Sequence, residues 1–139
     1  MEYEFFDHTA DIGMKAWGES MARMFENAAK GMFSIIFDIA DAEPTRTMKL
    51  DLDQKEENAE QMLVDWLSEL LYILDTQDLV PTSFRVTHLD GEHLEAEISG
   101  NPFNKEIHRY KTEVKSVTYH MLEIGRENDK YFGRILFDI

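Results

Sequence analysis

Two carboxylates and an imidazole lie together on one short polar segment near the start of the chain. Asp7, His8 and Asp11 are separated only by Thr9 and Ala10, between two stretches that favour strands. Such a group could bind a cation or act as an acid and a base. Asp and Thr side chains in turns also hydrogen-bond the neighbouring backbone, which is their commoner role. The spacing alone leaves both interpretations open and favours the structural one.

A second pair of carboxylates lies at the end of the sequence. If Ile139 is the C-terminal residue, its α-carboxylate stands beside the side chain of Asp138. Two adjacent carboxylates suit a hard cation such as Ca²⁺ or Mg²⁺. Chain ends are usually frayed, but the apolar residues Leu136, Phe137 and Ile139 indicate that this one is docked. A metal site is predicted only if the fold brings this end near Asp11.

The remaining polar motifs are weaker. Within residues 111–120, Lys115 or His120 could contact a phosphate or a partner, although alternating polar residues on a strand generally face water. His88, His93 and His108 lack the spacing of metal ligands, and we interpret them as surface residues. Glycine-rich phosphate loops and the nucleophile elbow are both absent, so no motif identifies an enzyme.

The excess of acidic residues limits the classes of molecule that the chain can bind. Lys and Arg number 14 against 28 Asp and Glu, which gives a formal net charge of −14. Nucleic-acid affinity comes largely from cationic side chains, so we expect no direct nucleic-acid binding. A basic protein or a divalent cation complements this charge better. The chain has no cysteine, which excludes disulfides and thiolate sites.

The length of 139 residues fits one domain, residues 1–139. The first residues do not resemble a signal peptide, and no apolar run approaches the roughly 20 residues of a membrane helix. We therefore expect a soluble, cytoplasmic protein that does not contact membranes. Its oligomeric state is not predicted.

Hydrophobic periodicity predicts an α+β fold, a two-layer sandwich with two main helices packed on a mostly antiparallel sheet. Ser20 is the expected N-cap of a helix that ends near Phe37, and Trp66 should be buried in a second helix. Asp90-Gly91 is typical of a hairpin turn. Residues 100–110 are polar and irregular. The second helix covers residues 58–74, strands are expected at 3–8, 11–18, 45–53, 82–89, 93–98, 113–124 and 131–137, and a polar loop at 125–130.

The sequence resembles the archease family over nearly its whole length. The most specific stretch is Phe-Asp-His-Thr-Ala-Asp-Ile-Gly at residues 6–13, followed by Ala-Trp-Gly at 16–18. The helical segment 63–72, the stretch Lys-Ser-Val-Thr-Tyr-His at 115–120 and the final Phe-Asp-Ile at 137–139 match as well. All of these motifs in order make the resemblance specific.

This resemblance implies a fold of the strand-helix-strand-strand type and a function as a protein cofactor, not as an enzyme. Archeases assist the RtcB-type RNA ligase in tRNA splicing and RNA repair. They promote guanylylation of the ligase, sustain multiple turnover and broaden its use of nucleotides. They also bind a divalent cation, described as calcium. For this chain we expect Ca²⁺, with Mg²⁺ or Mn²⁺ as alternatives, because oxygen-rich sites accept all three ions.

Carried over by motif, the implied metal ligands are Asp11, Asp138 and Ile139. Lys115, Asp7 and His8 are secondary candidates: Lys115 for contact with the ligase or nucleotide, and the other two for shaping the turn. Two alternatives from other classes stay open: a metal-dependent hydrolase that uses Asp7, His8 and Asp11, and a general chaperone or adaptor with an exposed apolar surface.

Overall fold

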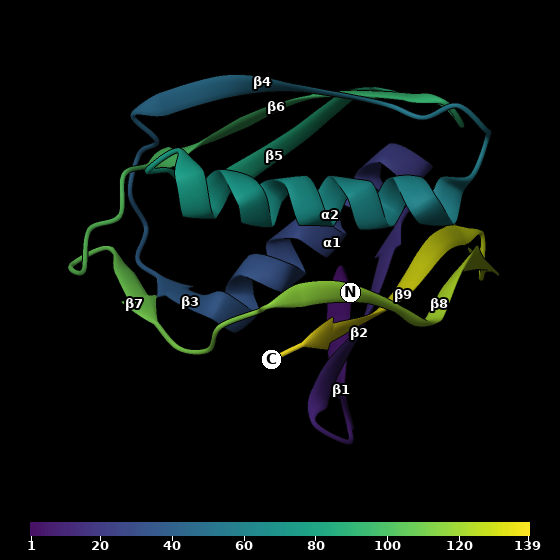
Figure 1. Cartoon of the computed structure of the whole chain (residues 1–139), viewed down its shortest axis with the longest axis horizontal. Coiled ribbons are helices and arrows are strands. Elements are labelled where there is room, and N and C mark those ends of the chain that lie inside the picture. Colours follow the sequence, from purple (N-terminus) through teal and green to yellow (C-terminus); the bar gives the residue numbers. More distant parts are fainter.

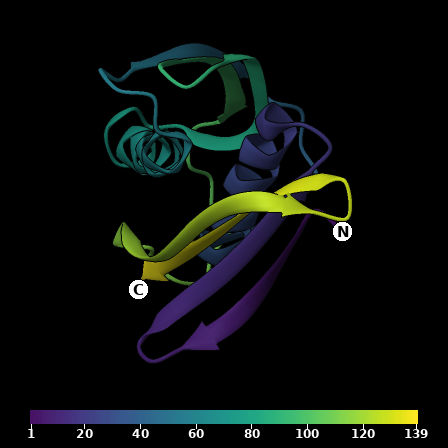
Figure 2. The same ribbon diagram turned by 90° about the vertical axis from the view of Figure 1, so that its right-hand side faces the viewer.

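Two helices are held between two antiparallel sheets in the computed structural model, which describes residues 1–139 (Figures 1 and 2). The helices are α1 (Met21–Ile36) and α2 (Ala59–Thr76). The strands are β1 (Tyr3–His8), β2 (Asp11–Gly18), β3 (Phe37–Ile39), β4 (Arg46–Asp53), β5 (Val80–Leu89), β6 (His93–Asn101), β7 (His108–Tyr110), β8 (Ser116–Glu127) and β9 (Lys130–Asp138).

Each strand pairs with its neighbours antiparallel, and the strands form three separate sheets. The four-stranded sheet has the order β1-β2-β9-β8, so the first and last strands of the chain are brought together in it. The three-stranded sheet has the order β4-β6-β5. β3 and β7 form a small two-stranded ribbon. The pairing of β2 with β9 places residues from opposite ends of the chain at the same sheet end.

Local sequence signals define both helices. The side chain of Ser20 accepts a hydrogen bond from Arg23 N at 3.1 Å at the start of α1. The side chain of Asn58 accepts one from Gln61 N at 3.0 Å at the start of α2. Each cap satisfies a backbone N–H that has no partner within its helix. The predicted starts of both helices are therefore confirmed.

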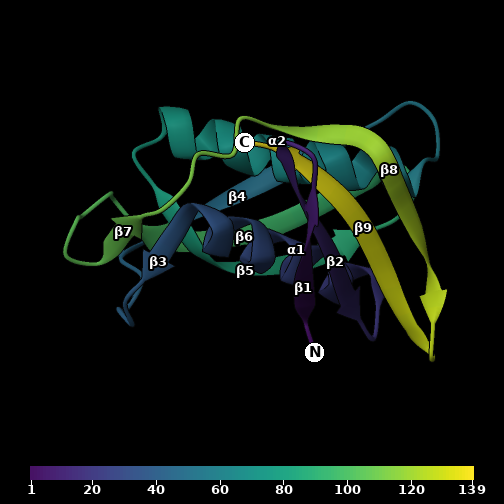
Figure 3. The same cartoon turned by 90° about the horizontal axis from the view of Figure 1, so that it is seen from below.

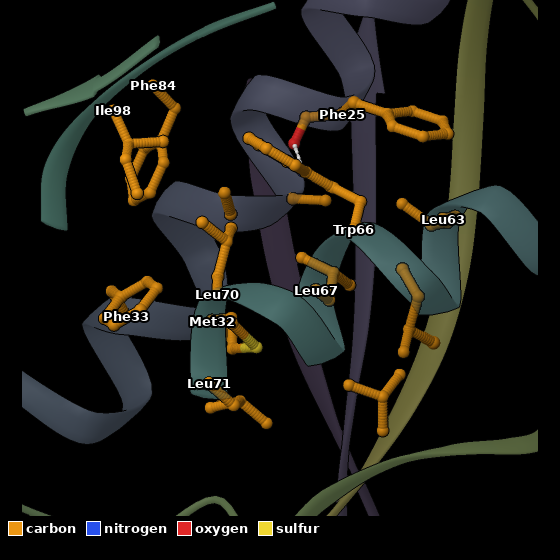
Figure 4. Close-up of a cluster of buried hydrophobic side chains, with 14 of the residues drawn as sticks. Phe25, Met32, Phe33, Leu63, Trp66, Leu67, Leu70, Leu71, Phe84 and Ile98 are labelled. Carbon is orange, nitrogen blue, oxygen red and sulfur yellow. Dashed lines mark hydrogen bonds between the residues drawn. The ribbon is translucent and has the colours of Figure 1, made fainter. Parts of the chain in front are cut away.

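The core lies where α1 and α2 pack against each other and against both larger sheets, and Figure 4 shows part of it. Trp66 is completely buried, as predicted, and its Nε1–H donates to the backbone oxygen of Phe25 at 2.9 Å. That bond satisfies the only polar group of the indole inside the core, where an unpaired donor would be costly. The rings of Phe33 and Phe84 stack beside it with centroids 5.7 Å apart. This packing joins the two helices to the sheets that carry the polar sites.

The predicted α+β class, with two helices packed on antiparallel sheets, is confirmed. The strands form two larger sheets on opposite sides of the helices, where one sheet was expected, because β4 and β5 pair only with β6. Neither helix is long and apolar enough to cross a membrane.

Two local predictions are wrong. The irregular segment 100–110 contains β7, which pairs with the equally short β3. The loop expected at 125–130 is a tight hairpin, because β8 continues to Glu127 and β9 begins at Lys130. Asn128 and Asp129 make the turn with positive φ angles of 52° and 64°. Such angles suit the right-handed twist of the flanking strands, and Asn and Asp tolerate them better than most residues.

Candidate functional site

One row of side chains crosses all four strands of the β1-β2-β9-β8 sheet near its end. The register pairs His8 with Asp11 and Asp11 with Asp138. Asp138 in turn pairs with Ser116. Directly paired residues of antiparallel strands project to the same face, so these four side chains lie side by side. Figure 3 shows the C-terminus beside the β1–β2 turn and the start of β8. The fold thus brings Asp138 beside Asp11, the condition on which the metal prediction depended.

The imidazole of His8 lies beside the Asp11 carboxylate without a regular hydrogen bond. Its Nδ1 lies 3.4 Å from Asp11 Oδ2, beyond the usual range of about 2.7–3.2 Å. The Nδ1 atom is buried and has no hydrogen-bond partner. The ring of His120 approaches from β8, with the two imidazole centroids 5.4 Å apart. A buried polar atom of this kind can accept a further partner, such as a water molecule or an ion.

The last residues of the chain are fixed in place. The backbone oxygen of Asp138 accepts a hydrogen bond from Lys115 N at 2.7 Å. Phe137 is fully buried and Ile139 packs against the hydrophobic core. The end is therefore docked, as the apolar residues predicted, and the Asp138 carboxylate is held beside Asp11. At the β1–β2 turn, Ala10 adopts a φ of 61°, a strained conformation for a residue with a Cβ.

Two of the secondary candidates lie outside this row. Asp7 is exposed and pairs with Ile12, so its side chain projects to the opposite face of the sheet from His8 and Asp11. This placement separates the three residues on which the hydrolase alternative depends. Lys115 contributes its backbone N–H, while its side chain is exposed to solvent and free to contact a partner.

The row could hold a divalent cation. Carboxylate oxygens are the preferred ligands of Ca²⁺ and Mg²⁺, and Asp11 and Asp138 supply them from paired positions. The unpartnered nitrogen of His8 adds a donor that suits Mn²⁺ or Zn²⁺ better. The donor set therefore fits a divalent ion, although it does not select one metal.

A second group of potential ligands was missed by the sequence analysis. Asp51, His93 and Glu95 each place one ligand atom within 4.8 Å of the others. Exposed and buried residues alternate along β4 and β6. Asp51 lies at an outward-facing position of β4, and His93 and Glu95 lie at outward-facing positions of β6. Each strand shows only an ordinary exposed polar face. The only sequence signal was that these residues fall on the polar face of each strand. That signal points to a shared cluster only once β4 is known to pair with β6.

His108 was expected at the surface, and that prediction is wrong, because its side chain is completely buried. Its ring packs against Phe37 and Phe103, with centroid distances of 5.9 Å in both cases. Its Nδ1 accepts a hydrogen bond from Asn104 N at 3.0 Å. Burial lowers the pKa of His108 because it disfavours the charged imidazolium. This histidine is a structural part of the β3–β7 ribbon.

Comparison with known proteins assigns the family. The model of the archease protein family (MTH1598/TM1083) matches residues 3–139. The chain belongs to the archease family. The archease of Methanosarcina acetivorans is 37% identical over 142 residues, which cover 99% of this chain and 96% of that protein. The archease of Methanothermobacter thermautotrophicus is also 37% identical, over 99% of this chain and 98% of its own. The predicted archease resemblance is confirmed.

Solved archease structures support the same fold. The solution structure of Methanobacterium thermoautotrophicum protein 1598 matches with a TM-score of 0.83 at 37% identity, covering 99% of this chain and 98% of that one. A crystal structure from Thermotoga maritima, described as an archease and possible chaperone, matches with a TM-score of 0.65 at 21% identity. That match covers 96% of this chain and 94% of the other, and it supports the fold alone.

Proposed function

We propose that the chain is a protein activator of an RtcB-type RNA ligase in tRNA splicing and RNA repair. It acts in the cytoplasm, promotes guanylylation and multiple turnover of the ligase, and broadens its use of nucleotides. It has no catalytic residues of its own. The observation that carries the proposal is the direct cross-strand pairing of Asp11 with Asp138, in a chain that matches the archease family model over residues 3–139.

The residues of the row have separate roles in this proposal. Asp11, Asp138 and the Ile139 α-carboxylate would hold a divalent cation, with Ca²⁺ the expected ion and Mg²⁺ or Mn²⁺ also suited to the oxygen ligands. His8, whose ring nitrogen lies 3.4 Å from the Asp11 carboxylate, would shape the turn beside the site. The Lys115 N–H positions Asp138 through its backbone oxygen. When bound, the cation would supply positive charge that can stabilise phosphate oxygens.

The charge of the chain favours this partner class. A ligase that binds RNA and nucleotides must present a basic surface, and a chain with a net charge of −14 is attracted to it over a long range. The same charge disfavours binding of the activator to the RNA itself. The side chain of Lys115 is exposed next to the carboxylate row, where it could contact the ligase or its nucleotide.

The test is ligation by a purified RtcB-type ligase with RNA substrate in excess, with and without this protein. We expect the protein to raise the yield from about one turnover to many and to accelerate formation of the guanylylated ligase. Asp11→Asn and Asp138→Asn, which keep the side-chain shape, should each reduce this activation by about 10–100-fold, the usual loss when a metal site is disturbed. Asp75→Asn at the exposed end of α2 is the matched control and should activate normally.

Two outcomes would support the other classes. Phosphoester hydrolysis by the protein alone would indicate a metal-dependent hydrolase. Suppression of aggregation of unrelated proteins, unchanged by Asp11→Asn and Asp138→Asn, would indicate a general chaperone.

A further inference from the structure

His93 lies among carboxylates on the outer face of the three-stranded sheet, away from the row of Asp11 and Asp138. The register pairs Asp51 with Glu95 and Asp53 with His93, which puts all four side chains on one face. The alternate residues of the same strands, Leu50 and Leu94, are buried against the helices. The cluster therefore faces solvent and is supported from below by the core.

The distances within the cluster match the spacing of ligands around one small metal ion. His93 Nε2 lies 3.4 Å from Asp51 Oδ1 and 3.6 Å from Glu95 Oε1. A tetrahedral ion with bonds of about 2.0–2.2 Å holds neighbouring donor atoms about 3.3–3.6 Å apart. Both separations exceed the length of an ordinary hydrogen bond. His93 Nε2 is thus too far from either oxygen for a good hydrogen bond, yet close enough to share an ion with both.

Asp53 orients the imidazole for this purpose. His93 Nδ1 lies 2.5 Å from Asp53 Oδ1. In the neutral ring this bond places the proton on Nδ1, so the lone pair of Nε2 is directed at Asp51 and Glu95. A metal-binding histidine usually donates its other ring N–H to a carboxylate in this manner, which fixes the tautomer and the ring orientation.

We propose that Asp51, His93 and Glu95 bind a divalent transition-metal ion of the zinc class, with Asp53 as the positioning residue for His93. Three protein ligands leave a fourth position for water, the arrangement of open zinc sites. Imidazole nitrogen favours Zn²⁺, Co²⁺ or Ni²⁺ over Ca²⁺ and Mg²⁺. The site lies on a different sheet from the carboxylate row, and it does not depend on the proposed ligase function.

A proton is the alternative occupant of Nε2. The hydrogen-bonded carboxylate of Asp53 raises the pKa of His93, and the carboxylate of Glu95 adds to the effect. In that case the cluster would be an ordinary surface ion pair in which His93 neutralises part of the acidic face. Direct measurement of metal binding separates the two.

The test is titration with Co²⁺, followed by its visible absorption and by calorimetry. It uses the full chain carrying Asp11→Asn and Asp138→Asn, so that the carboxylate row does not contribute. We expect one Co²⁺ per chain with the absorption of a tetrahedral site. In this background His93→Gln should abolish binding, and Asp53→Asn should weaken it by about 10–100-fold. Competition by Zn²⁺ but not by Ca²⁺ should confirm the metal class.

His88→Gln is the matched control, because it removes a neighbouring imidazole whose ring centroid is 5.6 Å from that of His93. His88 Nε2 lies 2.8 Å from Asp90 Oδ2, so it is already bonded elsewhere. Co²⁺ affinity should change by less than twofold. The proposal is overturned if the folded chain binds no Co²⁺, or if His88→Gln and His93→Gln have equal effects. Circular dichroism of each variant confirms that it is folded.

Discussion

The two groups of carboxylates and imidazoles in this molecule are assembled differently. The first row joins β1 and β2 at one end of the chain to β9 at the other. The side chains of His8 and Asp11 there are only 35% and 23% exposed. The second cluster joins β4 and β6 on an outer face, where Asp51 and Glu95 are 67% and 52% exposed. In both groups the side chains come from paired positions on antiparallel strands.

This difference predicts how each group responds to change. Partly buried carboxylates depend on the packing that holds them, since their charges are less screened by water and need a cation or other partner. Exposed carboxylates remain solvated without a partner, and their removal disturbs only the ligand they hold. The first row should therefore be sensitive to distant changes in the sheet, and the second should tolerate them.

The largest expected effect comes from lengthening the chain beyond Ile139. If Ile139 carries the free α-carboxylate, adding Gly-Ser moves that carboxylate away from Asp11 and Asp138. Activation of an RtcB-type ligase should fall by about 10–100-fold, as expected when a metal site loses a ligand or its support. Ligation with excess RNA measures this loss.

The control is Co²⁺ binding to the His93 cluster, measured on the chain extended by Gly-Ser. It should be unchanged, because the His93 cluster lies on another sheet. Full activation by the extended chain would show that the α-carboxylate has no role in the row.

Substitution of two glycines, one near each group, tests whether the two groups differ in packing. A Cβ at Gly13 would overlap the ring of Phe6, while the atoms nearest to a Cβ at Gly91 belong to the flexible, exposed side chain of Glu57. Gly13→Ala should lower the free energy of unfolding by about 1–3 kcal/mol, the cost of overpacking. Gly91→Ala should change it by less than about 0.5 kcal/mol. Urea denaturation of both variants gives the two values, and equal values would refute the contrast in packing.

The smallest expected effect concerns His108, which belongs to neither group. Burial lowers the pKa of His108 from its ordinary value of 6.5, so the unfolded chain takes up a proton at higher pH than the folded chain. The stability that this residue contributes is complete above about pH 6.5 and falls as the pH drops toward the lowered pKa. His108→Asn retains an acceptor for Asn104 N but cannot be protonated in this range.

Denaturation of wild type and His108→Asn at about pH 7.5 and about pH 5.5 tests the direction of this pH dependence. Histidine is the side chain whose ordinary pKa lies between these two values. The acid-induced loss of stability should be smaller in the variant. If the acid-induced loss of stability were the same in the variant, other titrating groups would cause all of that loss.

Local signals predicted much of the fold. Ser20 and the Asp90-Gly91 turn act over a few residues, and the elements next to them lie where these signals indicated. β3 and β7 were missed because strands of three residues are too short to show a period. The division into two larger sheets could not be predicted because strand pairing between distant segments leaves no local mark.

The candidate sites show the same limit. Spacing alone offered the carboxylates at Asp11 and at Asp138 as candidate ligands and favoured a structural role for the first group, and the resemblance to archeases then joined them into one predicted site. The register then placed them side by side. His93 lies in no motif, so its sequence context indicates only a surface residue and gives no reason to associate it with Asp51. Its ligand-like neighbours depend on the pairing of β4 with β6.

The most direct test of the central claim is multiple-turnover ligation by an RtcB-type ligase with wild-type protein, Asp11→Asn and Asp75→Asn in parallel. We expect many turnovers with wild type and Asp75→Asn, and about one turnover with folded Asp11→Asn. Full activation by Asp11→Asn, or no activation by wild type of a cognate ligase, would contradict it.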